Sequence, residues 1–216
     1  MVPPSPDHLH EAVQALRAAT TAEALLAATA ALARLTSPDT APVLVEVLGY
    51  NNPGAAVTAV EGLIRLGAAA VPALLELDPE NYGARAWAVR ALAGIGDVRG
   101  LAVLVDALGT DVAASVRRAA ARGLGNLQLA GLMPSERRTV QERCLAALLA
   151  ACGDGEWVVR YAVAVGLEGL APGLEPASAA REQLRAGLVA LCEAADDNPP
   201  VVCLRAKVAL SRLDPP

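Results

Sequence analysis

The chain has 216 residues, of which 54% are hydrophobic and 19% are charged, and this composition excludes an intrinsically disordered chain. Only 2% are aromatic and Phe is absent, so a core of Ala, Leu and Val favours closely packed helices over a β-sandwich or barrel. The net charge of −5 disfavours non-specific nucleic-acid binding, because neutralising phosphates requires a basic surface.

From the N-terminus onward, the chain alternates two kinds of apolar helix. One kind ends in a recurring AVxxLxxL-like unit, found at Ala59–Gly67, Ala88–Gly96, Ala120–Gln128 and Val163–Ala171, with weaker copies at Thr29–Leu35 and Ala206–Leu213. The other kind lies between the copies, at Ala41–Gly49, Ala70–Leu77 and Arg99–Gly109. Prolines suit helix first turns and glycines suit helix ends, as at Pro42, Pro72, Gly49, Gly67, Gly96 and Gly109. The extreme ends, Met1–Pro6 and Asp214–Pro216, are expected to fray.

The copies repeat at a period typical of solenoids. Their anchor leucines are spaced by 31, 29, 32, 43 and 43 residues, and are Leu32, Leu63, Leu92, Leu124, Leu167 and Leu210. A single helix pair cannot bury its apolar stripe, so neighbouring pairs must stack. The sequence therefore predicts an all-α fold, a HEAT-like α-solenoid of about six helix pairs that forms one domain over residues 1–216.

The two long periods have a visible cause. Gln128–Cys152 and Leu170–Ala195 each hold a loop followed by a longer helix, with Ser residues placed to cap near a Glu. We therefore predict longer first helices in the C-terminal half rather than an additional domain.

A turn-forming residue lies a short distance before each strong copy of the helix-ending unit and before the weaker copy at Ala206–Leu213. These residues lie about a dozen positions before the anchor leucine and are Asn51, Asn81, Asp111, Asp154 and Asn198. We expect them to cap helices or form turns. Seven residues before the leucine, three copies carry an arginine: Arg85, Arg117 and Arg160.

Motifs for conventional chemistry are missing. The sequence has no P-loop, GxGxxG or GxSxG, and no acid/base pair of carboxylates is legible. His8 and His10 are expected on a solvated helix start, so no metal site is predicted. The four cysteines form no CxxC pair; Cys144 and Cys152 are expected to pack as small apolar groups, with a substrate-carrying thiol as the alternative. Without a signal peptide or a span-length apolar run, we predict a reduced, cytoplasmic protein with no membrane insertion.

The aromatic residues and arginines suggest a ligand surface. Tyr82 and Trp157 occupy the same repeat position, so stacking places them in one row, with the arginine row close by. Such a ridge could hold a flat, conjugated ligand that carries carboxylates. The alternative is that the rings fill gaps between repeats while the arginines bond neighbouring turns.

Four collinear blocks carry a specific resemblance. They are YNNPGAAVTAVEGLIRLG (Tyr50–Gly67), NYGARAWAVRALAGIGD (Asn81–Asp97), SVRRAAARGLGNL (Ser115–Leu127) and EWVVRYAVAVGLEGL (Glu156–Leu170). The chain resembles the F-type subunits of heterodimeric phycocyanobilin lyases, HEAT-like proteins of phycobilisome assembly.

The resemblance implies an enzyme subunit of the cyanobacterial cytosol that is active only with an E-type partner. The pair would attach phycocyanobilin, a linear tetrapyrrole substrate, through a thioether to a cysteine of the phycocyanin α subunit; no prosthetic group is expected. Related isomerising subunits carry a His-Cys element, and Asn81–Ala86 has neither residue, which favours plain ligation.

With that ligand in place, the rows give candidate bilin contacts but no catalytic residue. Propionates are expected near Arg85, Arg90, Arg117 or Arg160. Ring contacts are expected near Tyr82, Trp87, Trp157 and Tyr161. Pyrrole-nitrogen contacts are expected near Asp97, Asp111 or Asp154. The alternatives are a non-catalytic chaperone or adaptor for phycobiliprotein assembly or degradation and a generic HEAT scaffold; a HEAT-type DNA glycosylase is disfavoured by the net charge.

Overall fold

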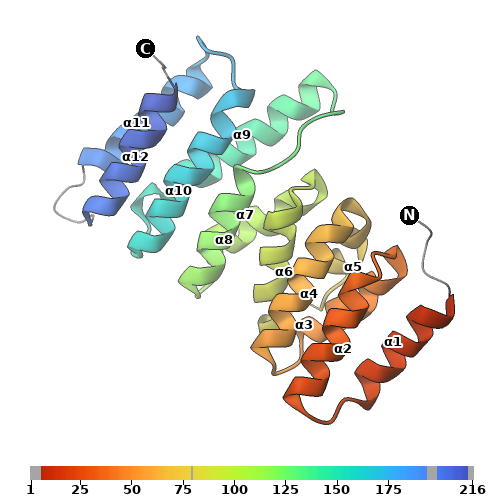
Figure 1. The fold of residues 1–216 in the computed structure, drawn as a ribbon. Helices are drawn as coiled ribbons and strands as arrows, with labels where there is room; N and C mark the ends of the chain where they lie inside the picture. The colour runs from red at the N-terminus through yellow and green to blue at the C-terminus, as the bar shows by residue number, and fades with distance from the viewer. Residues whose placement is uncertain (1–5, 79, 194–198, 214–216) are drawn as a thin grey trace. The chain divides into compact units, whose positions relative to one another are not determined.

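The computed structural model describes residues 6–78, 80–193 and 199–213, and all regular elements in these ranges are helices (Figure 1). The chain divides into two compact units, Met1–Asp97 and Val98–Pro216. The predicted single domain stays a prediction, and so does the fraying of the ends, which lie outside the described ranges apart from Pro6 at the start of a helix.

The first unit consists of three helix pairs. Its elements are α1 (Pro6–Ala18), α2 (Ala22–Arg34), η1 (Pro38–Thr40), α3 (Ala41–Leu48), α4 (Pro53–Leu66), η2 (Gly67–Ala70), α5 (Val71–Leu75) and α6 (Tyr82–Ile95), where η denotes a 3₁₀ turn. The second helix of each pair packs on that of the next, since α4 lies against both α2 and α6.

The second unit continues the same alternation. Its elements are η3 (Val98–Gly100), α7 (Leu101–Thr110), α8 (Ala114–Leu124), α9 (Pro134–Ala150), η4 (Ala151–Gly153), α10 (Trp157–Leu170), η5 (Ala171–Gly173), α11 (Ala179–Glu193) and α12 (Pro200–Leu213). Here α10 packs against both α8 and α12. The described residues therefore hold six helix pairs, as the repeat predicted. The longer first helices, α9 with 17 residues and α11 with 15, account for the two 43-residue periods.

The anchor leucines form the core. Those of α2, α4, α6, α8 and α10 have at most 1% of their surface exposed and are Leu32, Leu63, Leu92, Leu124 and Leu167. Each places a branched side chain in the seam between adjacent pairs, which stabilises the stack by about 2 kcal/mol per leucine. Leu210 is only half-buried, because α12, which packs mainly against α10 and α11, is the last helix in the described ranges.

Several helix boundaries differ from the sequence prediction by one or two residues. The cap of α4 is Asn52, whose Oδ1 accepts from Ala55 N at 3.0 Å, rather than Asn51. The helix α7 runs past Gly109 to Thr110, whereas Gly49, Gly67 and Gly96 do end their helices. Adjacent Asn residues and isolated glycines give similar local signals, so tertiary packing decides the register.

Of the two predicted serine caps, one is confirmed and the other is not. At α9 the chain enters through Met133, whose backbone N–H donates to Glu136 at 3.0 Å, and Ser135 lies inside the first turn rather than at the cap. Ser178 does act as predicted, since its Oγ accepts from Arg181 N at 3.2 Å. Asn198 lies outside the described residues.

One helical stretch, Pro53–Leu75, is by length and composition apolar enough to cross a membrane, with a mean hydropathy of 1.5 over its best window. It is the sole such stretch that the described ranges contain. Gly67 interrupts it with a φ of 61°, so α4 has 14 residues, fewer than the roughly 20 that a span needs. Because α4 also packs between α2 and α6, core packing explains its apolar character.

Glycines allow α8 and α10 to approach closely. A Cβ on Gly166 would collide with Ala121 O and would meet Leu148 Cδ2 at 2.8 Å. One turn along α10, a Cβ on Gly169 would collide with Gly125 O. The backbones are therefore in direct contact here, and any side chain would push the helices apart.

We predict that Gly166→Ala lowers the free energy of unfolding by about 1–3 kcal/mol, although Gly→Ala inside a helix normally raises it, because overpacking outweighs the gain in helix propensity. Urea unfolding monitored by circular dichroism measures the change. The matched control is Gly109→Ala in α7, where a Cβ has nothing within 4 Å and should be neutral or stabilising. Equal effects of the two substitutions would contradict the close approach.

Candidate functional site

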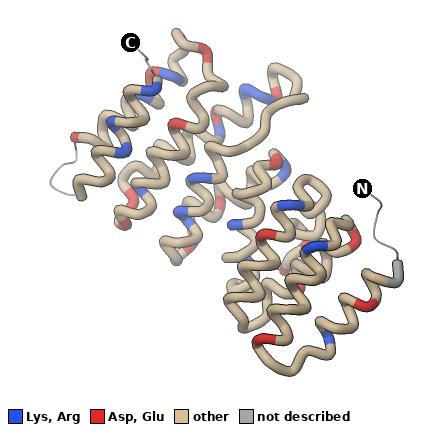
Figure 2. Tube along the Cα trace, viewed as in Figure 1, with Lys and Arg blue, Asp and Glu red and all other residues tan. Residues whose placement is uncertain are grey.

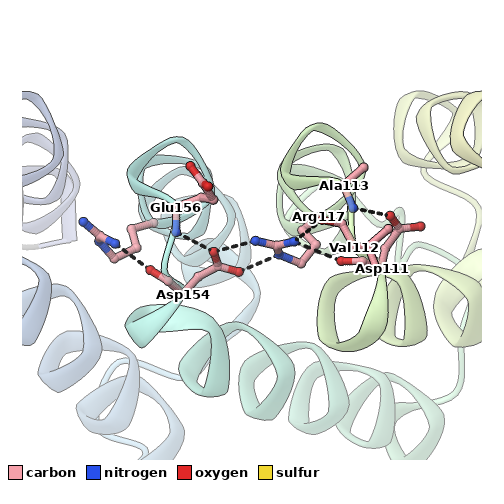
Figure 3. A network of polar contacts seen from close by, with 7 residues as sticks. Asp111, Val112, Ala113, Arg117, Asp154 and Glu156 are labelled. Atoms are coloured by element: carbon pink, nitrogen blue, oxygen red, sulfur yellow. Dashed lines mark hydrogen bonds and ion pairs between the residues drawn. The ribbon is translucent and has the colours of Figure 1, made fainter.

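Arg117 of α8 joins two successive turns of the second unit (Figure 3). Arg117 forms a bidentate ion pair with Asp154, with Nε–Oδ2 at 2.7 Å and Nη2–Oδ1 at 2.9 Å. Its Nη1 also donates to the carbonyls of Asp111 at 2.9 Å and Val112 at 3.1 Å. The guanidinium therefore ties the turn before α8 to the turn before α10.

The same bonding pattern recurs one repeat later. Arg160, on α10, donates from Nη1 to the carbonyl of Asp154 at 2.5 Å, six residues earlier, as Arg117 does to Asp111. The two aspartates also play matching parts. Asp154 Oδ1 accepts from Glu156 N and Asp111 Oδ1 accepts from Ala113 N, both at 2.8 Å. These aspartates were predicted as caps or turn formers, and they form the turns two residues before the actual caps.

The Arg117–Asp154 pair is strongly ionised. Its side chains are 17% and 10% exposed. Hydrogen bonding to Arg117 lowers the pKa of Asp154 below its ordinary value of 3.8, against the opposing effect of burial. The same hydrogen bond raises the pKa of Arg117. Both groups therefore carry full charge at neutral pH, and the pair stabilises the stack of α8 and α10.

A cavity of about 460 Å³ lies beside this pair. Asp111, Arg117 and Asp154 line it together with apolar residues of α7 and α9, including Leu108 and Ala147. Its volume is within the range of ligand pockets. The structure thus brings three of the predicted site residues to one cavity, but with their charges largely directed at each other.

The remaining candidates of the second unit lie on α10. Trp157 is its first residue and is 45% exposed. Tyr161 follows four residues later on the same helix face and is half-buried, as is Arg160. Trp157 is thus the candidate ring that this unit presents most openly.

In the first unit, the candidates gather on α6. Asn81 caps this helix, with Oδ1 accepting from Ala84 N at 3.1 Å, as predicted. Tyr82 comes next and is 71% exposed. Arg90 stacks on the ring of Trp87, with 4.4 Å between its Cζ and the ring centroid, which is a cation–π contact.

The two remaining candidates of this unit, Arg85 and Asp97, are both half-buried and both take part in polar contacts. Arg85 is on the first turn of α6, and Asp97 follows the left-handed Gly96 that ends it. That the arginine and aromatic rows bind a ligand therefore remains a prediction. The burial and the bonding of these residues differ from one position to the next.

Two of the four thiols, those of Cys144 and Cys152, are poor nucleophiles. Burial raises the pKa of Cys144 to about 12 and that of Cys152 to about 11. Cys152 Sγ donates to Leu148 O at 3.7 Å within its own helical turn. Because the thiolate is the reactive form, these settings favour apolar packing over the alternative of a substrate-carrying thiol.

No group of three or more His, Cys, Asp or Glu residues within the described ranges is placed to hold a metal ion. His8 and His10 are both exposed on α1, where the sequence predicted solvated positions.

Sequence reasoning missed one cluster in the second unit. Glu168 of α10 bonds two arginines of α12, Arg205 and, at 2.6 Å, Arg212. A further arginine, Arg181 of α11, lines a second cavity together with these three residues. The available signal was the single carboxylate in the apolar C-terminal half of the helix Trp157–Leu170, which implies a partly buried charge that needs a partner.

We predict that Asp154→Asn lowers the free energy of unfolding at neutral pH by about 2 kcal/mol, because it leaves Arg117 without its charged partner. The pKa of Asp154 is lower in the folded state, so its contribution is present above pH 3.8 and is lost as the pH falls through the folded-state value. The difference from wild type should therefore be constant near pH 6–7 and should shrink below about pH 4. Urea midpoints measured across this range test it.

Glu142→Gln, at an exposed position of α9, removes the same charge and serves as the control. A difference between wild type and Asp154→Asn that stays constant down to pH 3 would refute the assigned ionisation.

The helix pairs correspond to a known repeat family. Residues 84–110 and 116–154 match the PBS lyase HEAT-like repeat.

Full-length relatives and a solved structure agree with this match. The chain is 54% identical over 160 residues to the phycocyanin alpha phycocyanobilin lyase CpcF of Synechocystis sp. (strain PCC 6803), covering 74% of this chain and 75% of the relative. It is 48% identical to the bilin biosynthesis protein RpcF of Synechococcus sp. (strain WH8020), over 95% and 96% of the two chains. A chain in the complex of CpcE and CpcF of phycocyanin lyase from Nostoc sp. PCC7120 matches with a TM-score of 0.72 and 43% identity, covering 81% of this chain and 100% of that one.

Identity at this level over most of both chains, with the same stacked helix pairs, leaves one assignment: the chain belongs to the family of F-type (beta) phycocyanobilin lyase subunits.

Proposed function

We propose that this chain is the F-type subunit of a heterodimeric lyase that attaches a bilin, phycocyanobilin, through a thioether to a cysteine of the phycocyanin α subunit. The observation that carries this proposal is the 54% identity to a phycocyanin alpha phycocyanobilin lyase over three quarters of each chain. The partner is an E-type subunit, as in the related complex of CpcE and CpcF. Attachment in the cytosol, with no prosthetic group on the enzyme, completes the proposal.

The chemistry needs little from the enzyme's own nucleophiles. The acceptor cysteine adds its sulfur to the ethylidene carbon of the bilin, and its proton is returned to the tetrapyrrole, so nothing leaves. The lyase must hold the bilin so that one carbon and one face meet the thiol, and such orientation can supply much of the rate. The weakly acidic thiols Cys144 and Cys152 are consistent with this division of roles.

Among the predicted bilin contacts, the group on α6 has the most suitable setting. Tyr82 is exposed, and Arg90 stacks on Trp87. A guanidinium that stacks on a ring still directs its in-plane N–H groups outward, where a propionate can pair with them. We place ring contacts at Tyr82 and Trp87 and a propionate contact at Arg90.

The arginine at the turn of α8 is less available. Arg117 donates four hydrogen bonds, two to Asp154 and two to backbone carbonyls, out of five N–H groups. Its main role is therefore to fix the turn. The other predicted contacts stay predictions: Arg85, Asp97, Asp111, Asp154, Trp157, Arg160 and Tyr161.

Reconstitution tests the function. The chain is co-expressed with the E-type partner, a phycocyanobilin supply and the phycocyanin α subunit, and covalent bilin is read as fluorescence after denaturing electrophoresis. We expect attachment to require both subunits. Thioether formation with unaltered yield and stereochemistry when this chain is omitted would leave an adaptor role instead.

We further predict that Tyr82→Ala and Arg90→Gln each reduce the initial rate of attachment about three- to tenfold, because each removes one contact that orients the bilin. The exposure of Tyr82 makes a folding defect an improbable cause, and circular dichroism checks it. Arg118→Gln, at an exposed position of α8, is the charge-matched control. If the two variants attach the bilin at the rate of this control, the α6 residues do not contact the bilin.

A further inference from the structure

The cluster around Glu168 encloses a second cavity, of about 660 Å³, at the end of the second unit. It lies between α10, η5, α11 and α12, and its polar lining is Glu168, Arg181, Arg205 and Arg212. Both α11 and α12 carry basic positions (Figure 2). The volume falls within the range of small-molecule pockets, and convergent polar groups of this kind are typical of them.

The cavity has an excess of positive charge. Burial disfavours ionisation of Glu168, but the hydrogen bonds from Arg212 and Arg205 outweigh it and lower the pKa of this carboxyl below 4.5. Each oxygen of Glu168 accepts from one arginine, Oε1 from Arg212 and Oε2 from Arg205. Three guanidinium groups and one carboxylate leave a net charge of two at the cavity, which attracts an anion.

The three arginines differ in how fully they are bonded. Arg181 donates to the carbonyls of Ala171 at 3.0 Å and Leu213 at 2.8 Å, so it braces the cavity. Arg212 is 66% exposed, and it donates to Glu168 from Nη1. Arg205 is 14% exposed, and its Nη1 is buried with no acceptor among the described residues.

An unsatisfied guanidinium nitrogen is costly, since a buried donor without an acceptor loses its hydration and gains nothing in return. Both oxygens of Glu168 already accept from an arginine, Oε2 from Nη2 of Arg205 and Oε1 from Arg212, and neither accepts from Nη1 of Arg205. Because Arg205 lines the cavity, a carboxylate oxygen bound there can serve as a further acceptor for its guanidinium group, and the exposed edge of Arg212 can bind the second oxygen.

The remaining lining is apolar, with Val165, Pro172 and Leu213 among it. A free inorganic anion would leave these apolar surfaces in contact with water, whereas an organic acid with an apolar body would cover them. We infer that this cavity binds a carboxylate of an apolar organic acid, through Arg205 and Arg212. This inference rests on the proposed function for the identity of the acid, whose carboxylate is then one propionate of phycocyanobilin.

Binding of phycocyanobilin to the heterodimer with the E-type partner tests the inference, with the bilin absorption band as readout. The free diacid is compared with the dimethyl ester, which keeps the conjugated rings but has no carboxylate. We expect the ester to bind wild type about tenfold more weakly, and Arg205→Gln to weaken the diacid about tenfold while leaving the ester unchanged.

Arg212→Gln guards against a folding failure at Arg205, because its side chain is mostly exposed and its loss should cost little stability. It should weaken the diacid about threefold or more. Arg122→Gln, exposed on α8, is the control for a lost charge away from the cavity and should match wild type. Equal binding of diacid and ester, absent binding of both, or arginine variants indistinguishable from Arg122→Gln would each overturn the inference.

Parallel attachment assays separate this inference from the proposed function. If wild type attaches the bilin normally but binds diacid and ester equally well, the carboxylate-binding cavity is refuted and the lyase function stands. If binding depends on Arg205 and on the carboxylates but no attachment occurs with the partner and acceptor present, the lyase function is refuted and the carboxylate-binding cavity stands.

Discussion

Within each of the two units, the stacking of one second helix on the next is the interaction on which the structure depends. A short amphipathic helix pair cannot bury its apolar stripe alone, so every anchor leucine needs a neighbouring pair to cover it. The near-absence of aromatic residues is part of this solution, because Ala and Gly let the helices approach closely. The contact of α10 with α8 through Gly166 is the extreme case, in which backbone meets backbone.

Polar groups at the turns add direction to this packing. Apolar contacts between small residues tolerate sliding, whereas the bidentate pair of Arg117 with Asp154 fixes one repeat relative to the next within the second unit. Arg117 bonds Asp111 in the same way as Arg160 bonds Asp154. This recurring contact explains why the turn former and the arginine recur together in the sequence. These bonds make the turns rigid, so they can hold exposed rings such as that of Trp157 in fixed positions.

The sequence predicts the helix pairs well because their signal is repeated. The period, the anchor leucines and the longer helices α9 and α11 follow from self-similarity, which averages out local ambiguity. Individual caps are less predictable, since Asn51 and Asn52 are equally good cap residues and only packing selects between them. The bonds of Arg117 to Asp154 join residues 37 positions apart, so their pairing requires the folded stack.

The candidate site shows the same division. The rows of rings and arginines are visible as recurring positions, but exposure separates Tyr82 from Tyr161 and bonding separates Arg90 from Arg117. The cluster at Glu168 does not follow the repeat at all. Its partners come from 37 and 44 residues away, and no periodic pattern marks them.

The protonation of the buried thiols has a consequence for selectivity. A protein that handles an electrophilic pigment is itself a target, since any thiolate nearby could be alkylated in place of the intended acceptor. With pKa values of about 12 and 11, Cys144 and Cys152 hold almost no thiolate at neutral pH. Their protonation thus protects these two positions from self-labelling, and leaves the electrophile for the acceptor cysteine of another chain.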